Sequence, residues 1–130
     1  MKFYEPNETS YTNRLVKELL KTIESTNTRN QILITSFNID ALKILRKESE
    51  TIPIGILYEK LPENWKKDKV FLNAVTIHLD YRFLTLNQLE EINLSNTKAF
   101  VYTCNDPREI TQLWDAGLYG VITDDPLKFI

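Results

Sequence analysis

Residues 99–126 decide the fold, and they read AFVYTCNDPREITQLWDAGLYGVITDDP. Two apolar runs in this stretch, 99–103 and 119–123, are typical of buried strands. The segment between them begins like a helix, because Pro107 suits a first helical turn. It also ends like one, because Gly117 can adopt the left-handed conformation that closes a helix. The stretch therefore predicts a strand–helix–strand unit, the building block of a parallel sheet.

Polar side chains that can accept hydrogen bonds from free backbone amides mark the starts of three helices. Asn105 or Asp106 is expected to cap the helix that contains Pro107. Asn38 is expected to cap a helix whose inner face carries Ile39, Leu42 and Leu45. Thr85 and Gln88 have the spacing of a capping box, in which each side chain bonds the backbone of the other residue.

The rest of the chain continues the same alternation. An amphipathic pattern over 15–23 predicts a first helix, which Ser10 or Thr12 is expected to cap and the polar cluster 25–28 to end. Further apolar runs predict three upstream strands: 32–36, 52–58 and 74–79. The segment 59–72 has no clear pattern. We therefore predict one α/β domain over residues 1–130, with a parallel sheet and no domain boundary.

Composition excludes several classes of protein. The chain has 130 residues, a net charge of −2 and 42% hydrophobic residues, which is ordinary for a soluble domain. The near-neutral charge argues against nucleic acid as a partner. No apolar run approaches the roughly 18 residues of a membrane span, and residues 1–6 lack the apolar core of a secretory signal. We therefore expect a cytoplasmic protein.

A single cysteine and a single histidine limit the chemistry further. Cys104 alone cannot form an internal disulfide framework or a multi-cysteine zinc site, and we interpret it as a structural thiol. His78 alone cannot form a two-histidine acid–base pair. It could act as an acid, a base or a phosphate donor, or it could bond a neighbouring loop.

Ligands of parallel α/β folds gather at the carboxyl ends of the strands. The residues at those predicted ends are Ser36, Phe37, Tyr58, His78, Asp80, Thr103, Asn105, Thr123 and Asp124. The aromatic residues Phe37, Tyr58 and Tyr102 could line a pocket or plug the end of the sheet. The pattern predicts a binding face without naming a reaction.

Two charged segments each have two interpretations. Asp124 and Asp125 could bind a cation, but paired acids after a strand often cap a turn. The run 65–69 (WKKDK) could bind an anion, and a solvated helix face is the simpler interpretation.

The last two predicted strands carry a family resemblance. Residues 101–107 (VYTCNDP) and 117–126 (GLYGVITDDP) resemble the closing signature of the glycerophosphodiester phosphodiesterase family, V-W-T-V-N-D followed by a helix and G-V-D-G-I-I-T-D-x-P. Residues 34–38 (ITSFN) resemble that family's strand ending in S-F-D/N. Segments 54–57 and 74–83 are similar to the parts that lie between. The resemblance runs in order from about residue 31 to residue 126.

The resemblance implies a TIM barrel that hydrolyses glycerophosphodiesters to glycerol 3-phosphate and an alcohol. Members of the family use Mg²⁺ or Ca²⁺ held by carboxylates, and two histidines act as acid and base. By the same resemblance, Phe37 and Tyr102 are expected to form walls of the substrate pocket and His78 to contact the diester. Asn105 and Asp124 are expected to hold loops in place.

The chain also departs from the family pattern. The motifs H-R-G, E-x-D and H-D are missing, and if Pro6 matches the proline of the family's E-I-K-P strand, Phe3 replaces the metal-binding Glu and Glu5 replaces the Lys. Tyr102 stands where Trp is usual, and Tyr119 where an acid is usual. We therefore expect no catalytic residue, no metal ligand and no cofactor in this chain.

Half a barrel would leave two open sheet edges, because a TIM barrel needs eight strands and about 250 residues. Three outcomes are compatible with the sequence. Two copies could associate as a homodimer, which we favour. The chain could instead pair with a separately encoded amino-terminal half, or flatten into a doubly wound layer.

Two functions from different classes follow. The chain could be the carboxyl-terminal part of a glycerophosphodiester phosphodiesterase, inactive alone. It could otherwise be a non-catalytic remnant that binds glycerophosphodiester or glycerol phosphate, or serves as an oligomerisation module. A receiver-like signalling domain is a weaker third interpretation, since Phe37 and Asn38, not clustered acids, follow the first strand.

Overall fold

The computed structural model describes residues 9–28 and 31–130. The predicted alternation of helices and strands is confirmed. In chain order the elements are α1 (Thr9–Thr26), β1 (Ile34–Ser36), α2 (Ile39–Glu48), β2 (Ile54–Tyr58), α3 (Trp65–Leu72), β3 (Thr76–Asp80), α4 (Leu86–Leu94), β4 (Lys98–Tyr102), the 3₁₀ turn η2 (Pro107–Ile110), α5 (Thr111–Asp115), β5 (Gly120–Val121) and the 3₁₀ turn η3 (Pro126–Phe129). The segment 1–6, compared above with the family's E-I-K-P strand, lies outside the described residues.

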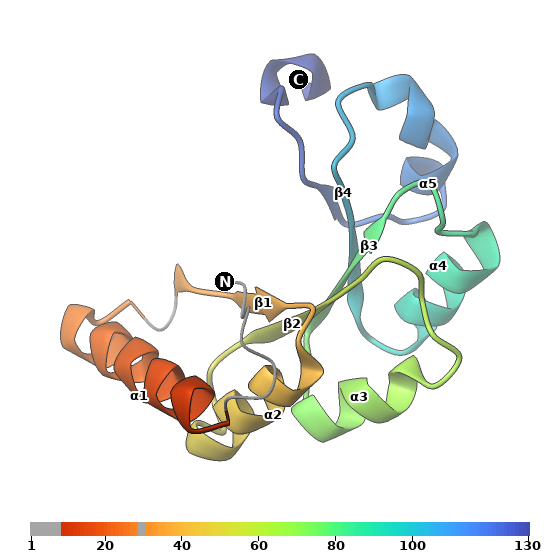
Figure 1. The fold of residues 1–130 in the computed structure, drawn as a ribbon. Helices are drawn as coiled ribbons and strands as arrows, with labels where there is room; N and C mark the ends of the chain where they lie inside the picture. Colours follow the sequence, from red (N-terminus) through yellow and green to blue (C-terminus); the bar gives the residue numbers. More distant parts are fainter. Residues whose placement is uncertain (1–8, 29–30) are drawn as a thin grey trace.

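The five strands form one parallel sheet in the order β1-β2-β3-β4-β5. Because crossovers between parallel strands are right-handed, an order without reversal places every connecting helix on the same face. Figure 1 shows α1 to α5 following one another around one side of the sheet. The doubly wound layer considered from the sequence is therefore wrong, since that fold requires the strand order to reverse.

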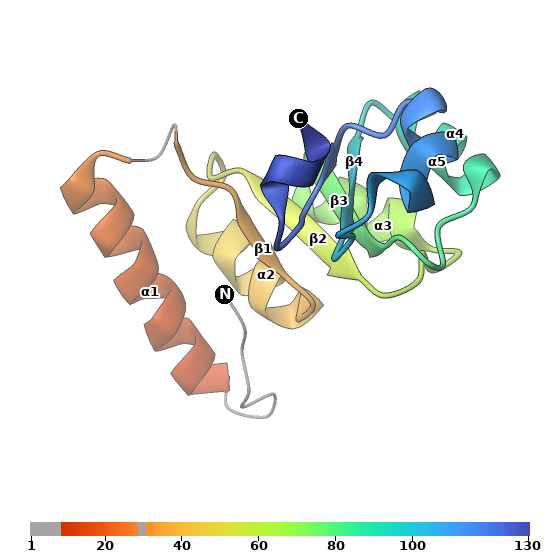
Figure 2. The same cartoon turned by 90° about the horizontal axis from the view of Figure 1, so that it is seen from above.

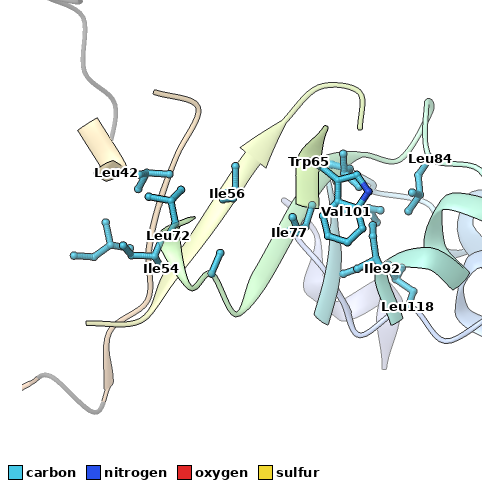
Figure 3. Close-up of a cluster of buried hydrophobic side chains, with 14 of the residues drawn as sticks. Leu42, Ile54, Ile56, Trp65, Leu72, Ile77, Leu84, Ile92, Val101 and Leu118 are labelled. Atoms are coloured by element: carbon cyan, nitrogen blue, oxygen red, sulfur yellow. The ribbon is translucent and has the colours of Figure 1, made fainter. Parts of the chain in front are cut away.

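The main core lies between the strands and this layer of helices. Ile54, Ile56, Ile77 and Val101 are fully buried there against helix residues such as Leu42, Leu72 and Ile92 (Figure 3). Burying each such side chain stabilises the fold by about 1.5–3 kcal/mol. Helix α1 extends this layer, because it packs beside α2 at the β1 end of the sheet (Figure 2).

Alternate strand residues point to the opposite face, which we call the inner face. It is formed by Thr76, His78 and Asp80 of β3 with Phe100 and Tyr102 of β4, and no described α-helix packs on it. The carboxyl ends of the strands, where ligands gather in such folds, lie along one rim of the sheet.

Most of the predicted caps are confirmed. Asn38 accepts a hydrogen bond from the Ala41 amide, and Thr85 and Gln88 form the expected capping box. Of the two candidates for the later helix, Asp106 caps it by accepting from the Arg108 amide. Gly117 has a φ of 99°, as its position after a helix required.

Two local predictions need correction. Thr12 does not cap α1, because it is buried inside a helix that spans Thr9–Thr26, and Ser10 lies within the same span. Residues 65–69 form a solvated helix face only in part: Lys66 and Lys67 are exposed as expected, but Trp65 is buried and its Nε1 donates to Glu91 at 3.0 Å. The indole has a large apolar surface, and burying it in the core stabilises the fold although the neighbouring lysines favour contact with water.

None of the helices in the described part of the chain is both long and apolar enough to cross a membrane.

Candidate functional site

Two of the three predicted substrate-binding residues meet at the carboxyl rim. The rings of Phe37 and Tyr102 make an edge-to-face contact, with centroids 6.0 Å apart and planes at 89°. Phe37 follows β1 directly and is 49% exposed, while Tyr102 ends β4 and is partly buried. The pair therefore presents an aromatic surface that a ligand can reach.

Tyr58 and Tyr102 hold this surface in position. The Tyr102 hydroxyl donates to the backbone carbonyl of Tyr58 at 2.8 Å. The Tyr58 hydroxyl points to the opposite, helix-covered side of the sheet and donates to Asp68 of α3 at 2.8 Å. Burial and the Asp68 carboxylate raise the pKa of Tyr58, so this phenol stays protonated at neutral pH.

His78, the third predicted residue, does not lie at a strand end. The strand β3 continues to Asp80, which places His78 in its middle, on the inner face. Its Nε2 lies 2.9 Å from the Thr76 hydroxyl, and its ring stacks on Phe100 with centroids 4.8 Å apart. His78 is only 5% exposed, so it lies below the rim.

The surroundings of His78 keep its ring uncharged. Burial lowers the pKa of His78 to about 4, and its Nδ1 has no hydrogen-bond partner among the described residues. Gly55 of β2 leaves room for the ring, because a Cβ there would lie 3.0 Å from His78 Nε2 and even closer to the Thr76 hydroxyl. At neutral pH the ring is therefore a polar but uncharged part of the inner face.

Arg82 is a charged rim residue that no sequence motif singled out. Its Nε and backbone amide both donate to Asp80 Oδ1 at 3.0 Å, and its Nη2 donates to Asp80 Oδ2 at 2.6 Å. These bonds lower the pKa of Asp80 below its ordinary value. The available signal was the order of residues: an acid that ends a strand, followed two positions later by an arginine.

A second cation lies near Arg82. The Lys60 ammonium is 4.7 Å from the centre of the Phe83 ring, and the Arg82 guanidinium carbon is 5.4 Å from the same centre. Both follow the carboxyl ends of neighbouring strands, β2 and β3. The rim thus combines the aromatic pair with two cations.

Asn105 joins two rim loops, as the family resemblance implied. Its Oδ1 accepts hydrogen bonds from the Thr123 hydroxyl and from the Asp124 amide, both at 2.8 Å. Asp124 takes part through its backbone. Cys104 is buried, donates weakly to the Asp106 carbonyl and has its pKa raised by burial. These facts fit a structural thiol.

The divalent cation that the resemblance implies does not fit the described residues. No three side chains of His, Cys, Asp or Glu in residues 9–28 and 31–130 are grouped so that they could hold a metal ion. At the rim, both Asp80 oxygens are occupied by Arg82. The positions of Phe3 and Glu5, which the family resemblance placed at a metal-ligand strand, lie outside the described residues.

Comparisons with known proteins place these features in a family. The sequence profile of the Glycerophosphoryl diester phosphodiesterase family matches residues 1–128. A curated relative is the glycerophosphodiester phosphodiesterase of Caldanaerobacter subterraneus subsp. tengcongensis. It is 29% identical over 115 residues, which are 88% of this chain and 47% of the relative.

Solved structures with the same fold include an Oleispira antarctica phosphodiesterase in complex with the product sn-glycerol-3-phosphate. It has a TM-score of 0.80 and 21% identity, and the match covers 92% of this chain and 49% of that one. The Thermotoga maritima glycerophosphodiester phosphodiesterase has a TM-score of 0.68 and 22% identity, with coverages of 88% and 52%. The chain therefore spans about half the length of the relatives that it matches.

Proposed function

Because this chain belongs to the Glycerophosphoryl diester phosphodiesterase family, we propose that it forms the carboxyl-terminal part of a TIM barrel that hydrolyses glycerophosphodiesters to glycerol 3-phosphate and an alcohol. One observation carries the proposal: the family profile covers nearly the whole chain, yet the chain spans about half of its relatives. The five parallel strands in sequential order support it, because that order is the order of strands around such a barrel.

In this proposal the chain supplies one wall of the substrate pocket. Phe37 and Tyr102 contact the diester at the rim, and the uncharged His78 forms the floor below them. The support is their geometry: the aromatic pair is accessible, and the hydrogen bond to Tyr58 holds the Tyr102 ring in one orientation.

The proton-transfer groups and the metal ligands come from outside this chain. Its one histidine cannot provide both an acid and a base, and burial keeps that histidine uncharged at neutral pH. When bound, the divalent cation of the family would supply Lewis-acid assistance to phosphodiester cleavage. We therefore propose that the chain alone is inactive.

The remaining strands of the barrel are the partner that fits best. The five described strands and three more make the eight of a TIM barrel, whereas two copies of this chain would supply ten. Because barrel diameter grows with strand number, ten strands would leave the interior incompletely filled. We therefore propose an amino-terminal half, upstream or separate, in preference to the homodimer that the sequence alone favoured. A cytoplasmic location stays a prediction.

The decisive experiment measures hydrolysis of glycerophosphocholine with Mg²⁺ or Ca²⁺. The purified chain is expected to show none. Activity is expected when the part of the Caldanaerobacter relative that this chain does not match is co-expressed with it. Turnover by the chain alone, retained through successive purification steps, would contradict the proposal.

A non-catalytic module that binds glycerol phosphate is the second candidate. The accessible Phe37–Tyr102 pair favours it, together with the lack of a metal-binding group among the residues described. It predicts binding of sn-glycerol 3-phosphate but no turnover even with the complementary half present. NMR shifts at Phe37 and Tyr102 without restored activity would select this candidate.

A further inference from the structure

Residues 9–28 and 31–130 contain two copies of one small charged arrangement. In Asp80–Arg82 and again in Asp106–Arg108, the arginine backbone amide and Nε donate to Oδ1 of the aspartate, and Nη2 donates to Oδ2. The first pair begins at Asp80, the last residue of β3, and the second follows the carboxyl end of β4. Identical local chemistry in two places allows their surroundings to be compared directly.

The surroundings of the two pairs differ, and the difference favours Asp80–Arg82 over Asp106–Arg108 as a ligand-binding pair. The Asp80 side chain is 10% exposed and that of Arg82 64%, whereas the values for Asp106 and Arg108 are 35% and 90%. Asp80 belongs to the inner face and is the register partner of Tyr102. The first pair therefore holds its guanidinium beside the aromatic rim, while the second is an ordinary surface pair.

The Arg82 guanidinium retains hydrogen-bonding capacity. Of its five N–H groups, Asp80 accepts one from Nε and one from Nη2, and no other described residue accepts a hydrogen bond from this side chain. The three remaining donors are available to a ligand. Because the carboxylate fixes the orientation of the planar group, less side-chain freedom is lost when a ligand binds.

The charged groups around Arg82 are balanced in number, because Arg82 and Lys60 are positive while Asp80 and Glu59 are negative. Lys60 contributes a second positive charge at the Phe83 ring, and the described ion pairs of the chain do not include it. Glu59 is the other acid close enough to act on Arg82. Both cations lie close to the Phe83 ring, at 4.7 Å for the Lys60 ammonium and 5.4 Å for the Arg82 guanidinium carbon.

We propose that Arg82, oriented by Asp80 and assisted by Lys60, binds the phosphate group of the substrate at the rim. The inference rests on the proposed function, because it assigns the phosphate contact in the pocket whose wall is Phe37 and Tyr102. Asp80 acts as a positioning residue. The planar N–H groups of arginine match phosphate oxygens in geometry, which makes this residue type suited to the task.

The test is a titration of the isolated chain with sn-glycerol 3-phosphate, inorganic phosphate and glycerol, followed by NMR and calorimetry. Both phosphates are expected to bind and glycerol is not. Arg82→Gln should weaken phosphate binding roughly ten- to hundredfold, because a charge-assisted hydrogen bond is lost. Arg82→Lys keeps the charge without the planar geometry and should recover part of the loss.

Arg108→Gln is the matched control, because it removes the same charge from the same local arrangement. Its affinity for phosphate should equal that of the unmodified chain. An equal loss in both variants would mean that net charge alone attracts the anion, and it would overturn the assignment. Circular dichroism and the thermal midpoint confirm that each variant is folded.

The outcomes separate this inference from the proposed function. Unchanged phosphate affinity in Arg82→Gln overturns the role of Arg82, while shifts at Phe37 and Tyr102 would still support a pocket wall there. If sn-glycerol 3-phosphate shifts neither those residues nor Arg82, the phosphate contact and the pocket wall both fail.

Discussion

The Tyr102 hydroxyl donates a hydrogen bond to the backbone carbonyl oxygen of Tyr58, 2.8 Å away. Tyr102 ends β4 and Tyr58 ends β2, and β3 lies between these two strands in the sheet. The bond therefore ties together the rim ends of two strands that are not neighbours. It also fixes the ring that contacts Phe37.

Replacing Tyr102 by Phe tests this tie directly. The variant keeps the ring but leaves the Tyr58 carbonyl without its partner, so the free energy of unfolding should fall by about 0.5–1.5 kcal/mol. Urea denaturation measures the change. Tyr119→Phe is the control, because the exposed Tyr119 hydroxyl makes only a 3.5 Å contact with Lys98. Equal losses in the two variants would contradict a special role for the Tyr102 bond.

Gly55 is expected to tolerate no side chain. A Cβ at this position would lie 2.9 Å from Thr35 Cγ2, 3.0 Å from His78 Nε2 and closest to the Thr76 hydroxyl. Gly55→Ala should therefore destabilise the chain by about 1–3 kcal/mol, the usual cost of overpacking. Thr76→Ala in the same background removes the nearest clash and should recover part of the loss. A double variant no more stable than Gly55→Ala would contradict this account.

Stability should depend on pH through His78. The pKa of about 4 in the folded chain is below the ordinary value of 6.5, so between these values the unfolded chain binds more protons. Stability therefore falls as the pH drops from about 6.5 toward 4, by up to about 3 kcal/mol. Thermal midpoints over this range measure the effect.

His78→Phe should flatten that pH dependence, because this is the single histidine of the chain. The lowered pKa values of Asp80 and Asp106 add stability that is lost only at still lower pH, as the pH falls through their folded values. The two contributions therefore occupy different pH windows. An unchanged slope between pH 6.5 and 4 in His78→Phe would contradict the assignment.

Asn105→Ala should loosen the loop that follows β5. The variant removes the acceptor of both the Thr123 hydroxyl and the Asp124 amide. Hydrogen exchange at the Asp124 amide should become roughly tenfold faster, while the β3 amides keep their protection. Thr123→Val, which retains the bond to the Asp124 amide, should have a smaller effect. Equal acceleration in the two variants would mean that the amide bond contributes nothing.

Local chemistry explains which parts of the fold could be predicted. The caps at Asn38 and Thr85 depend on hydrogen bonds within three residues, so their side chains carry the whole signal. The prediction that Gly117 follows a helix end likewise depends only on the positive φ of that residue. The start of α1 was missed, because Thr12 has the chemistry of a cap but is buried inside the helix.

The meeting of two aromatic residues at the rim could be predicted for the same reason. Phe37 and Tyr102 follow or end parallel strands, and such ends share one rim, so their meeting could be expected before any contact was known. The sequence analysis placed His78 at the carboxyl end of its strand. The strand β3 instead continues to Asp80, because its pairing with β4 extends to Tyr102. Arg82 was missed, because its place near Tyr102 depends on the fold and not on a motif.

The order of strands and helices, most of the caps and the family follow from the amino-acid sequence alone, because hydrophobic periodicity and short-range hydrogen bonding act between residues close in the chain. The tertiary structure alone decided which side chains lie at the rim and which lie below it. The register between strands determines how far each side chain lies from the rim. That register depends on contacts between residues more than twenty positions apart, such as Asp80 with Tyr102. The same long-range packing determines that His78 is buried and uncharged while Arg82 remains accessible.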